Sequence, residues 1–498
     1  MNVNPITRLD YPDPDVIRVE DTYYMVSTTM HFMPGCEILQ SFDLVHWEHV
    51  TYVYETLDHT DAQQLKSGQN IYGQGMWAAS LRYHEGRFYI CFVANDTRKT
   101  YLYTSEKIDG PWKKQLIEGF YHDGSLLFDE DGRNYIVYGN DEIWITELNE
   151  DLTAPKKDGL HRLLVSDHKN PELGYEGSHI QKINGYYYIF LVHSLRDRWM
   201  RTEACFYSDS LEGEFTGGDV LCDDRGYCGQ GVAQGGIVDT PDGKWYAMLF
   251  QDSGAVGRIP ILLPVTWKDH FPVFGQNGHV PEEIEVHSTR PGYIYQPLVG
   301  SDDFCNGLLP RWQFNHDPDP RYYHLDALQG TYTITTREVC TELTQAVNTL
   351  TQRMSYPSCA AEVTVDASAL KEGDVAGLCA LQSCYAAVGI TKHHGKYEVL
   401  MLDKKEDGIL DMTEGTVVES HQMDFRLEAD FCNMKDEARC YYRVNKGDWL
   451  PIGTVHKLYF KLDHFTGCRF GLFCYAAEKT GGSACFRDFK YYDVDEIS

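Results

Sequence analysis

The sequence predicts an all-β protein with two domains. Its 34 tyrosines, 43 glycines and 19 prolines favour strands and turns, and few stretches have the periodicity of an amphipathic helix. Hairpin-like segments recur through roughly the first 300 residues, and alternating apolar and polar residues follow them. At 498 residues the chain exceeds the size at which one hydrophobic core stops growing, so two domains are expected.

Five segments share one pattern: a small or polar residue, alternating apolar residues, a two-residue turn and then aromatic residues. They read DVIRVEDTYYMV, SLRYHEGRFYICF, SLLFDEDGRNYIVY, SHIQKINGYYYIFL and GIVDTPDGKWYAML. Pairs such as Asn184-Gly185 are strong hairpin signals. The tyrosines that close the turns are 65, 46, 53 and 58 residues apart, which suits one four-stranded blade plus loops. Residues 1–297 are therefore expected to form a five-bladed β-propeller.

Acidic residues occur at one repeated position of these segments. The residue two places before the start of each inner strand is, in chain order, Asp13, Ala78, Asp123, Glu176 and Gln234. Innermost strands converge on the axis of a propeller, so we expect three carboxyl groups in one central pocket. Inverting glycoside hydrolysis needs an acid for the leaving oxygen and a base for water, about 6.5–9.5 Å apart. A third carboxylate can hold up the pKa of the acid, because like charges resist joint ionisation.

Three blocks of the chain resemble glycoside hydrolase family 43, and the resemblance covers nearly the whole length. NPITRLDYPDPDVIRVEDTYY is similar to the block of the general base, HDGSLLFDEDGR to that of a modulating aspartate, and YEGSHIQKINGYYY to that of the general acid. The resemblance implies that Asp13 is the general base, Asp123 the pKa modulator and orienter, and Glu176 the general acid. The repeat alignment selects the same three residues.

Two departures from the family pattern concern the pocket. Where many members read Trp-Ala-Pro-Asp, this chain reads WAAS from Trp77 to Ser80. Where many have a histidine, often tied to a central calcium ion or water cluster, it has Gln234, which is kept as a candidate substrate contact. Its amide oxygen can still bind a cation, but the imidazole is missing. We expect no required cofactor and leave a structural calcium ion as the alternative.

The resemblance also implies contacts to the terminal sugar. Trp77 would form a wall of the sugar site, with packing inside a blade as the alternative. Arg258 matches an arginine that hydrogen-bonds the hydroxyl groups of the sugar. In TTMHFMPGCEI, Met30 and Phe32 occupy the places of aromatic residues that border the sugar. Phe32 is therefore a candidate platform, Met30 indicates an altered sugar preference, and His31 is expected to serve local structure.

Residues 298–498 are expected to form a β-sandwich of jelly-roll type. Segments such as TYTITT, AAEVTVDA, KYEVLMLD and KLYFKLD alternate like half-buried antiparallel strands. The region resembles the concanavalin-like module at the C-terminus of β-xylosidases of the family. In those relatives the module packs on the propeller and can lend a loop to the pocket rim, which would favour cutting at chain ends. A purely stabilising role is the alternative.

The charge balance limits the partners. Lys and Arg total 44 against 74 Asp and Glu, a net charge of −30, which argues against nucleic acid and anionic membranes. No apolar window of about 18 residues and no signal-peptide pattern occur, so we expect no membrane span and a cytoplasmic location. The 15 cysteines lack metal-site spacing, so reduced, mostly buried thiols such as Cys91 and Cys474 are expected. The expected partner is a small oligosaccharide, and a homo-oligomer is left open.

The sequence thus predicts an exo-acting, inverting glycosidase that releases terminal xylose from β-xylo-oligosaccharides, as in xylan degradation. An α-L-arabinofuranosidase, alone or combined with the first activity, is the alternative, because the two pentoses present similar hydroxyl patterns. A non-catalytic carbohydrate-binding propeller is a rival that would not need acids in register. A propeller that acts on fructans by a retaining nucleophile is another, and it needs carboxylates about 5 Å apart.

Overall fold

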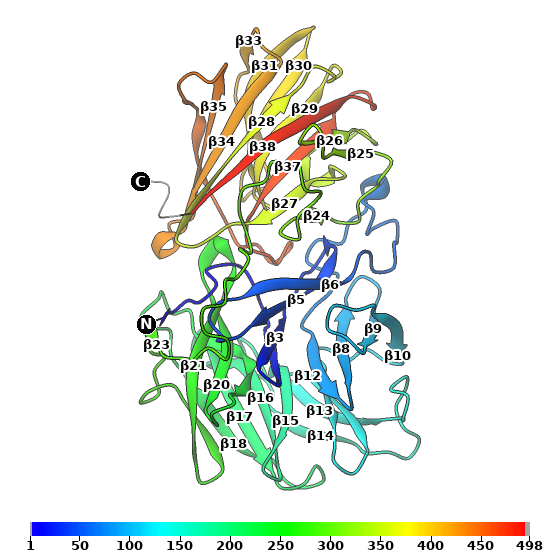
Figure 1. Ribbon diagram of the computed structural model, residues 1–498, viewed down its shortest axis with the longest axis vertical. Coiled ribbons are helices and arrows are strands. Elements are labelled where there is room, and N and C mark those ends of the chain that lie inside the picture. Colours follow the sequence, from blue (N-terminus) through cyan, green and yellow to red (C-terminus); the bar gives the residue numbers. More distant parts are fainter. Residues whose placement is uncertain (1, 494–498) are drawn as a thin grey trace.

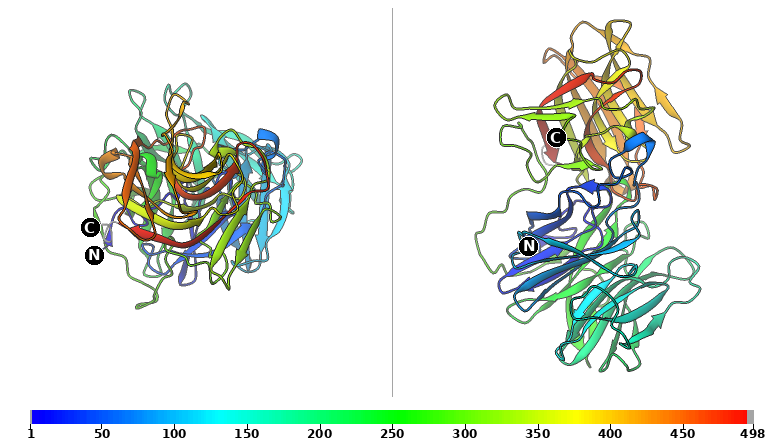
Figure 2. Two further views of the ribbon diagram at one scale, coloured as in Figure 1. Left: turned by 90° about the horizontal axis from the view of Figure 1, so that it is seen from above. Right: turned by 90° about the vertical axis from the view of Figure 1, so that its right-hand side faces the viewer.

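The computed structural model describes residues 2–493, which form two β domains stacked along the long axis of the molecule (Figure 1). Five four-stranded sheets make up the first domain, and two larger sheets make up the second (Figure 2). The helices among residues 2–493 are single 3-10 turns: η1 (Lys66–Gly68), η2 (Gly254–Val256), η3 (Leu343–Gln345) and η4 (Cys432–Met434). The predicted all-β class and the propeller followed by a sandwich are confirmed.

Each predicted hairpin forms the first two strands of one blade. In chain order the blades comprise β2 (Asp15–Val19), β3 (Thr22–Val26), β5 (Gly35–Ser41) and β6 (Glu48–Tyr54); β7 (Ser80–His84), β8 (Arg87–Ala94), β9 (Lys99–Ser105) and β10 (Lys113–Ile117); β11 (Ser125–Phe128), β12 (Asn134–Asn140), β13 (Glu142–Leu148) and β14 (His161–Ser166); β15 (Glu176–Ile183), β16 (Tyr186–Ser194), β17 (Arg201–Ser208) and β18 (Thr216–Leu221); β19 (Val232–Asp239), β20 (Trp245–Asp252), β21 (Arg258–Lys268) and β22 (Phe271–Phe274). The first strands contact one another in a closed ring, β2–β7–β11–β15–β19–β2. These five strands therefore surround the axis.

Apolar side chains fill the space between successive blades. A separate cluster lies between each pair of neighbours around the ring, and each cluster contains a fully buried residue from an inner strand pair. Representatives of the five clusters are Ile90, Ile136, Ile189, Leu249 and Met25. Because both faces of each blade are covered in this way, the ring of blades is held mainly by burial of apolar surface.

Side chains at the start of the inner strands tie each blade to the next. A backbone N–H near the start of one inner strand donates to the side chain that begins the preceding inner strand. The pairs are Leu81 N to Asp15 Oδ2 (2.7 Å), Leu126 N to Ser80 Oγ (3.1 Å) and Ile180 N to Ser125 Oγ (3.0 Å). The small and acidic residues that align the repeats thus have a structural task at the axis.

The N-terminal segment closes the ring against the fifth blade. β1 (Asn2–Val3) pairs with β23 (Glu283–Ile284). The Asn4 side chain donates from Nδ2 to the Leu262 carbonyl (2.8 Å) and accepts the Leu262 N–H at Oδ1 (3.1 Å). Each blade takes its four strands from one continuous segment, so closure depends on these contacts rather than on a blade shared between distant segments.

The second domain is a sandwich of two antiparallel sheets around one large core. One sheet holds β24 (Gln313–Asn315), β27 (Leu350–Arg353), β29 (Asp374–Leu381), β30 (Ala386–His393), β31 (Lys396–Lys404), β32 (Leu410–Met412), β33 (Thr416–Val418) and β37 (Arg469–Ala476). The other holds β25 (Tyr323–Asp326), β26 (Thr331–Thr335), β28 (Ser358–Asp366), β34 (Gln422–Asp430), β35 (Glu437–Val444), β36 (Leu450–Lys457) and β38 (Ser483–Asp493). Leu378 and Phe470 from the first sheet and Phe425 and Phe486 from the second are fully buried in the core between them.

A strand from the propeller completes the first of these sheets. β4 (Phe32–Met33), in the loop between β3 and β5, pairs with β24, so the sheet crosses the domain junction. In Figure 1, β24 lies at the end of the sandwich that faces the propeller. Nearby, Arg353 Nη1 lies 2.8 Å from Glu37 Oε2, and both side chains are buried. The junction therefore combines backbone pairing with a buried ion pair. Removal of either partner would leave a buried, unpaired charge and destabilise the fold.

No helix in the described part of the chain is long and apolar enough to cross a membrane. All the cysteines are free thiols and most are buried, including Cys91 and Cys474, as their sequence context predicts.

Candidate active site

The starts of three inner strands bring Asp13, Asp123 and Glu176 to one end of the propeller axis. They belong to the first, third and fourth blades. Asp13 and Asp123 have positive φ angles of 53° and 48°, and Gly177, which follows Glu176, has a φ of 63° at an irregularity of β15. Such left-handed residues and bulges re-aim side chains and occur often at functional sites. The three carboxyl groups are close enough for Glu176 and Asp13 to act on the charge of Asp123.

Asp13 is buried and is held by two donors. The Thr28 hydroxyl donates to Oδ2 at 2.6 Å, and Arg258 Nη1 lies 3.2 Å from Oδ1. Arg258 is itself 2% exposed, and its backbone N–H donates to Asp10 Oδ1 at 2.7 Å. The structure therefore places the predicted sugar-binding arginine directly on Asp13.

Glu176 and Asp123 lie in different environments. The Glu176 side chain is 18% exposed, and its Oε2 accepts a hydrogen bond from Asn140 Nδ2 at 2.7 Å. Asp123 is buried and accepts the Gly177 N–H at 2.9 Å. Burial, reinforced by the charges of Glu176 and Asp13, raises the pKa of Asp123 to about 6. Glu176 is thus partly open to solvent, while Asp123 is enclosed by the protein.

His122 lies between these two carboxyl groups. Its Nε2 is 3.5 Å from Asp123 Oδ2 and 3.5 Å from Glu176 Oε2. Burial disfavours the imidazolium, but the charges of Asp123 and Glu176 outweigh it and raise the pKa of His122 to about 9. Sequence reasoning missed His122 and Asn140. The position of His122 directly before Asp123 was visible in the sequence, but its charge depends on Glu176, which lies on another blade.

Two aromatic rings from different domains border the same place. The Trp77 ring lies 5.9 Å from the His122 ring and 5.5 Å from the ring of Phe465. Phe465 comes from the sandwich loop between β36 and β37, and its ring centre lies 4.5 Å from the Arg258 guanidinium carbon. The Gly467 N–H donates to Asp10 Oδ2 at 2.9 Å, so Asp10 holds both this loop and Arg258. The sandwich therefore contributes a side chain to the pocket region.

The structure corrects the interpretation of Phe32 as a sugar platform. Phe32 is 2% exposed, and the Arg469 guanidinium carbon lies 3.4 Å from its ring centre. The His31 ring, 4.3 Å away, also encloses it. Its strand pairs with the sandwich, so Phe32 packs in the domain junction. Met30 is 1% exposed, and its backbone pairs with Met76, which directly precedes Trp77.

Gln234 packs on Gly177, the residue that follows Glu176. It is 4% exposed, and it packs so closely on Gly177 that a Cβ there would lie 2.7 Å from the Gln234 side chain. Its backbone N–H donates to Glu203 Oε2 at 2.7 Å. Gly177 therefore must be glycine both for space and for its positive φ.

The axis beneath the acids holds a guanidinium group. Arg82 donates to Asp15 Oδ2 (2.8 Å), the Leu126 carbonyl (2.8 Å) and Ser125 Oγ (2.7 Å), so it links three blades. His179 Nδ1 lies 3.1 Å from the other oxygen of Asp15. Both oxygens of Asp15 thus have partners, so the side chain is held in place on the axis.

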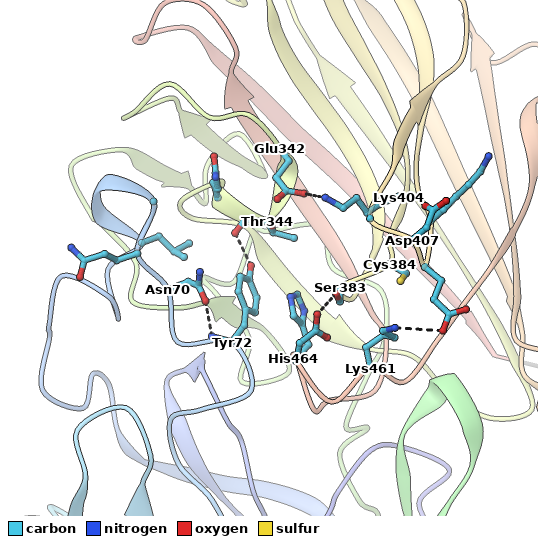
Figure 3. A pocket seen from close by; sticks show the side chains of 18 residues that line it. Asn70, Tyr72, Glu342, Thr344, Ser383, Cys384, Lys404, Asp407, Lys461 and His464 are labelled. Carbon is cyan, nitrogen blue, oxygen red and sulfur yellow. Dashed lines mark hydrogen bonds and ion pairs between the residues drawn. The ribbon is translucent and has the colours of Figure 1, made fainter.

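A polar hollow of about 510 Å³ lies between the propeller segment 65–72 and the sandwich (Figure 3). The Tyr72 ring stacks on His464 at 3.8 Å, and the Tyr72 hydroxyl donates to the Thr344 carbonyl at 2.7 Å. Ser383 donates to Asp463 at 2.6 Å. The hollow and the pocket share one loop, because His464 lines the hollow while the next residue, Phe465, reaches Trp77 and Arg258.

Glycoside hydrolases use carboxyl groups that approach the substrate from different sides. The propeller brings such groups together from separate blades, with Glu176 partly exposed and the other two buried. Comparison with known sequences gives the family. Residues 3–272 match glycosyl hydrolases family 43, and residues 301–492 match the beta xylosidase C-terminal concanavalin A-like domain. The chain therefore belongs to glycosyl hydrolases family 43 and is a glycosidase, as its sequence motifs predict.

Similar proteins cover the whole chain. The beta-xylosidase of Formosa agariphila is 26% identical over 99% of this chain and 89% of its own. The xylosidase/arabinosidase of Butyrivibrio fibrisolvens is 24% identical over 99% of both chains. A solved structure, the bifunctional GH43-CE protein of Bacteroides eggerthii, is 42% identical with a TM-score of 0.92 over 99% of this chain. This chain spans 64% of that protein's length.

Proposed function

We propose that the protein is an exo-acting, inverting glycosidase that releases terminal xylose from short β-xylo-oligosaccharides. In this reaction Asp13 is the general base, Glu176 the general acid and Asp123 the modulator and orienter of the acid. The observation that carries the proposal is the gathering of three carboxyl groups from three blades, of which Glu176 is the most open to the pocket and Asp13 is fixed by Arg258 and Thr28.

The contacts of each acid suit its proposed role. Thr28 and Arg258 orient the Asp13 carboxylate, so that it can take a proton from a water molecule that attacks the anomeric carbon. Glu176 gives a proton to the leaving oxygen on the opposite face of the sugar. Asp123, behind Glu176 and held by the Gly177 N–H, adds negative charge that opposes loss of the proton of the acid.

Exo action is supported by the aromatic border of the pocket. Trp77 and Phe465 lie 5.5 Å apart, and Phe465 also covers the guanidinium group of Arg258. A loop of the sandwich in this position restricts the passage of a long chain. We propose Trp77 as a contact to the terminal sugar and Arg258 as the group that fixes Asp13 beside it, while Met30 and Gln234 lie behind these residues.

Arabinofuranosidase activity, alone or beside the first, is the second candidate. It is supported by the relative from Butyrivibrio fibrisolvens that is named xylosidase/arabinosidase. We also propose that catalysis requires no metal, because general acid and base groups suffice for the reaction and Arg82 supplies positive charge on the axis. The cytoplasmic location and the oligomeric state stay predictions, which cell fractionation and light scattering would test.

The decisive experiment compares 4-nitrophenyl β-D-xyloside, 4-nitrophenyl α-L-arabinofuranoside and xylobiose as substrates. Wild type should prefer the xyloside and release α-xylose from xylobiose, the inverted anomer, in NMR spectra. Glu176→Ala should lose about 10²–10⁴-fold in kcat on xylobiose, whose leaving group needs protonation, and far less on the aryl xyloside. Glu172→Ala, an exposed glutamate of the same segment, should match wild type.

Faster cleavage of the arabinofuranoside would make the second candidate the main activity. Release of the β-anomer would contradict the inverting mechanism, and equal losses on both xylosides would remove Glu176 from the acid role.

A further inference from the structure

We propose that His122 holds the proton that Glu176 delivers to the leaving sugar and reloads Glu176 in every turnover. The inference rests on the proposed function, because it concerns the general acid of that reaction. It adds a residue that the hydrolysis of a glycoside by two carboxyl groups does not by itself require.

The position of His122 suits a proton relay. Its Nε2 lies 3.5 Å from Glu176 Oε2, at the long limit of a hydrogen bond. The backbone is fixed, because the His122 carbonyl accepts the Gly139 N–H at 3.0 Å. Trp77 borders the ring, yet the side chain is 20% exposed. The ring therefore reaches both Glu176 and solvent.

The charges around His122 favour a stored proton. Asp123 faces it from its own segment, Glu176 from β15 and Asp13 from the loop before β2. Of the cations nearby, Arg258 is paired with Asp13, and Arg201 donates to Asp252 at 2.9 Å. The carboxyl groups that face His122 therefore favour its protonated form and raise its pKa to about 9.

The proton balance of the reaction requires a source of protons for Glu176. In each turnover Glu176 loses a proton to the leaving oxygen, and Asp13 gains one from the attacking water. Glu176 must be protonated again before the next substrate reacts. In the proposed step the His122 Nε2–H bond breaks as an O–H bond forms on Glu176 Oε2, and His122 then takes a proton from water. Asp13 returns its proton to solvent, so no net proton is consumed.

The test separates a proton store from a fixed counter-ion, because the two roles predict opposite shifts. If His122 stores the proton, His122→Asn moves the alkaline limb of kcat on xylobiose to lower pH by at least one pH unit. At pH 8 the variant should lose at least about 10-fold in kcat. If His122 only contributes positive charge, its removal helps the acid to keep its proton, and the limb moves to higher pH. If the alkaline limb of kcat in His122→Asn lies at the same pH as in wild type or at a higher pH, the proposal is wrong.

Matched measurements keep the outcome specific. His324→Gln, a change to an exposed histidine of the sandwich, should leave the profile unchanged. With 2,4-dinitrophenyl β-xyloside, whose leaving group needs no proton, His122→Asn should equal wild type; a similar loss on this substrate counts against the relay.

Two further measurements apply if His122→Asn does not fold or if wild type shows no turnover. If His122→Asn does not fold, the temperature dependence of the wild-type alkaline limb decides. An imidazole limb moves to lower pH on warming, because the ionisation of imidazole absorbs much heat, whereas a carboxyl limb that stays fixed overturns the proposal. Absence of turnover by wild type on every glycoside would refute the proposed function itself, which is distinct from turnover with an unchanged limb.

Discussion

Among single residues, Glu203 shows how the propeller treats a carboxyl group away from the pocket. It lies in β17, is fully buried, and accepts the Gln234 N–H at Oε2. Its other oxygen, Oε1, has no hydrogen-bond partner among the described residues. Burial raises the pKa of Glu203 well above its usual value, because the charged form loses its hydration.

The raised pKa of Glu203 predicts that the stability of the protein depends on pH. A glutamate whose folded pKa is raised contributes its full stability below its unfolded pKa of about 4.3, and this stability is lost as pH rises through the folded pKa. Glu203→Gln removes that loss. The variant should match wild type at pH 5 and exceed it in the free energy of unfolding at pH 8. Urea denaturation at both pH values tests this.

The control for this prediction is Glu212→Gln, at an exposed position between β17 and β18. It should change neither value. If Glu203→Gln shifts stability equally at pH 5 and pH 8, Glu203 is not a buried neutral acid.

At the level of elements, the loop between β36 and β37 links the sandwich to the pocket. Phe465→Ala removes the ring that covers the Arg258 guanidinium and contacts Trp77. We expect kcat/KM for xylobiose to fall about 10–100-fold, mainly through a higher KM. The Arg258 guanidinium is then no longer covered, and the sugar site loses one of its bordering rings. Leu462→Ala, an exposed residue of the same loop, is the matched control.

Steady-state kinetics on xylobiose and xylotriose measure the effect. If the sandwich loop only stabilises the fold, Phe465→Ala lowers the melting temperature and leaves KM unchanged, which would contradict a role in substrate binding.

The elements that were predictable from sequence are those set by local chemistry. Asn184 and Gly185 both have positive φ and form the tight turn of β15 and β16, as the Asn-Gly pair predicts. The register of the acids followed from the same repeats. Phe32 was misplaced and Phe465 was missed for one shared reason: their positions depend on a domain junction between segments far apart in sequence, which neither periodicity nor turn chemistry reports.

For the whole molecule, the junction between the domains contains three buried histidines. His31 comes from the propeller and His316 and His464 from the sandwich; His31 and His316 have ring centres 4.9 Å apart. Burial lowers the pKa of His464 to about 4 and the pKa of the other two well below the usual value. The junction is therefore built for neutral imidazoles.

This arrangement predicts that acid weakens the junction. A histidine with a lowered folded pKa stabilises fully above about pH 6.5, and that stability is lost as pH falls towards 4. For His464 the difference is on the order of 2–3 kcal/mol by pH 4. The midpoint of urea unfolding should fall between pH 7 and pH 4.5, and less so in His464→Gln than in wild type. An equal fall in both proteins would exclude His464 as a cause, and His324→Gln again serves as control.

Closure of the ring by β1, β23 and Asn4 also orders events during synthesis on the ribosome. The flank of blade one around Met25 and Trp47 packs against Met248 and Leu262 of blade five. Until blade five has emerged, that apolar flank has no partner, and growing chains with such surfaces aggregate or recruit chaperones. The growing chain therefore needs protection from aggregation until blade five has been synthesised and the contacts of β1, β23 and Asn4 have formed.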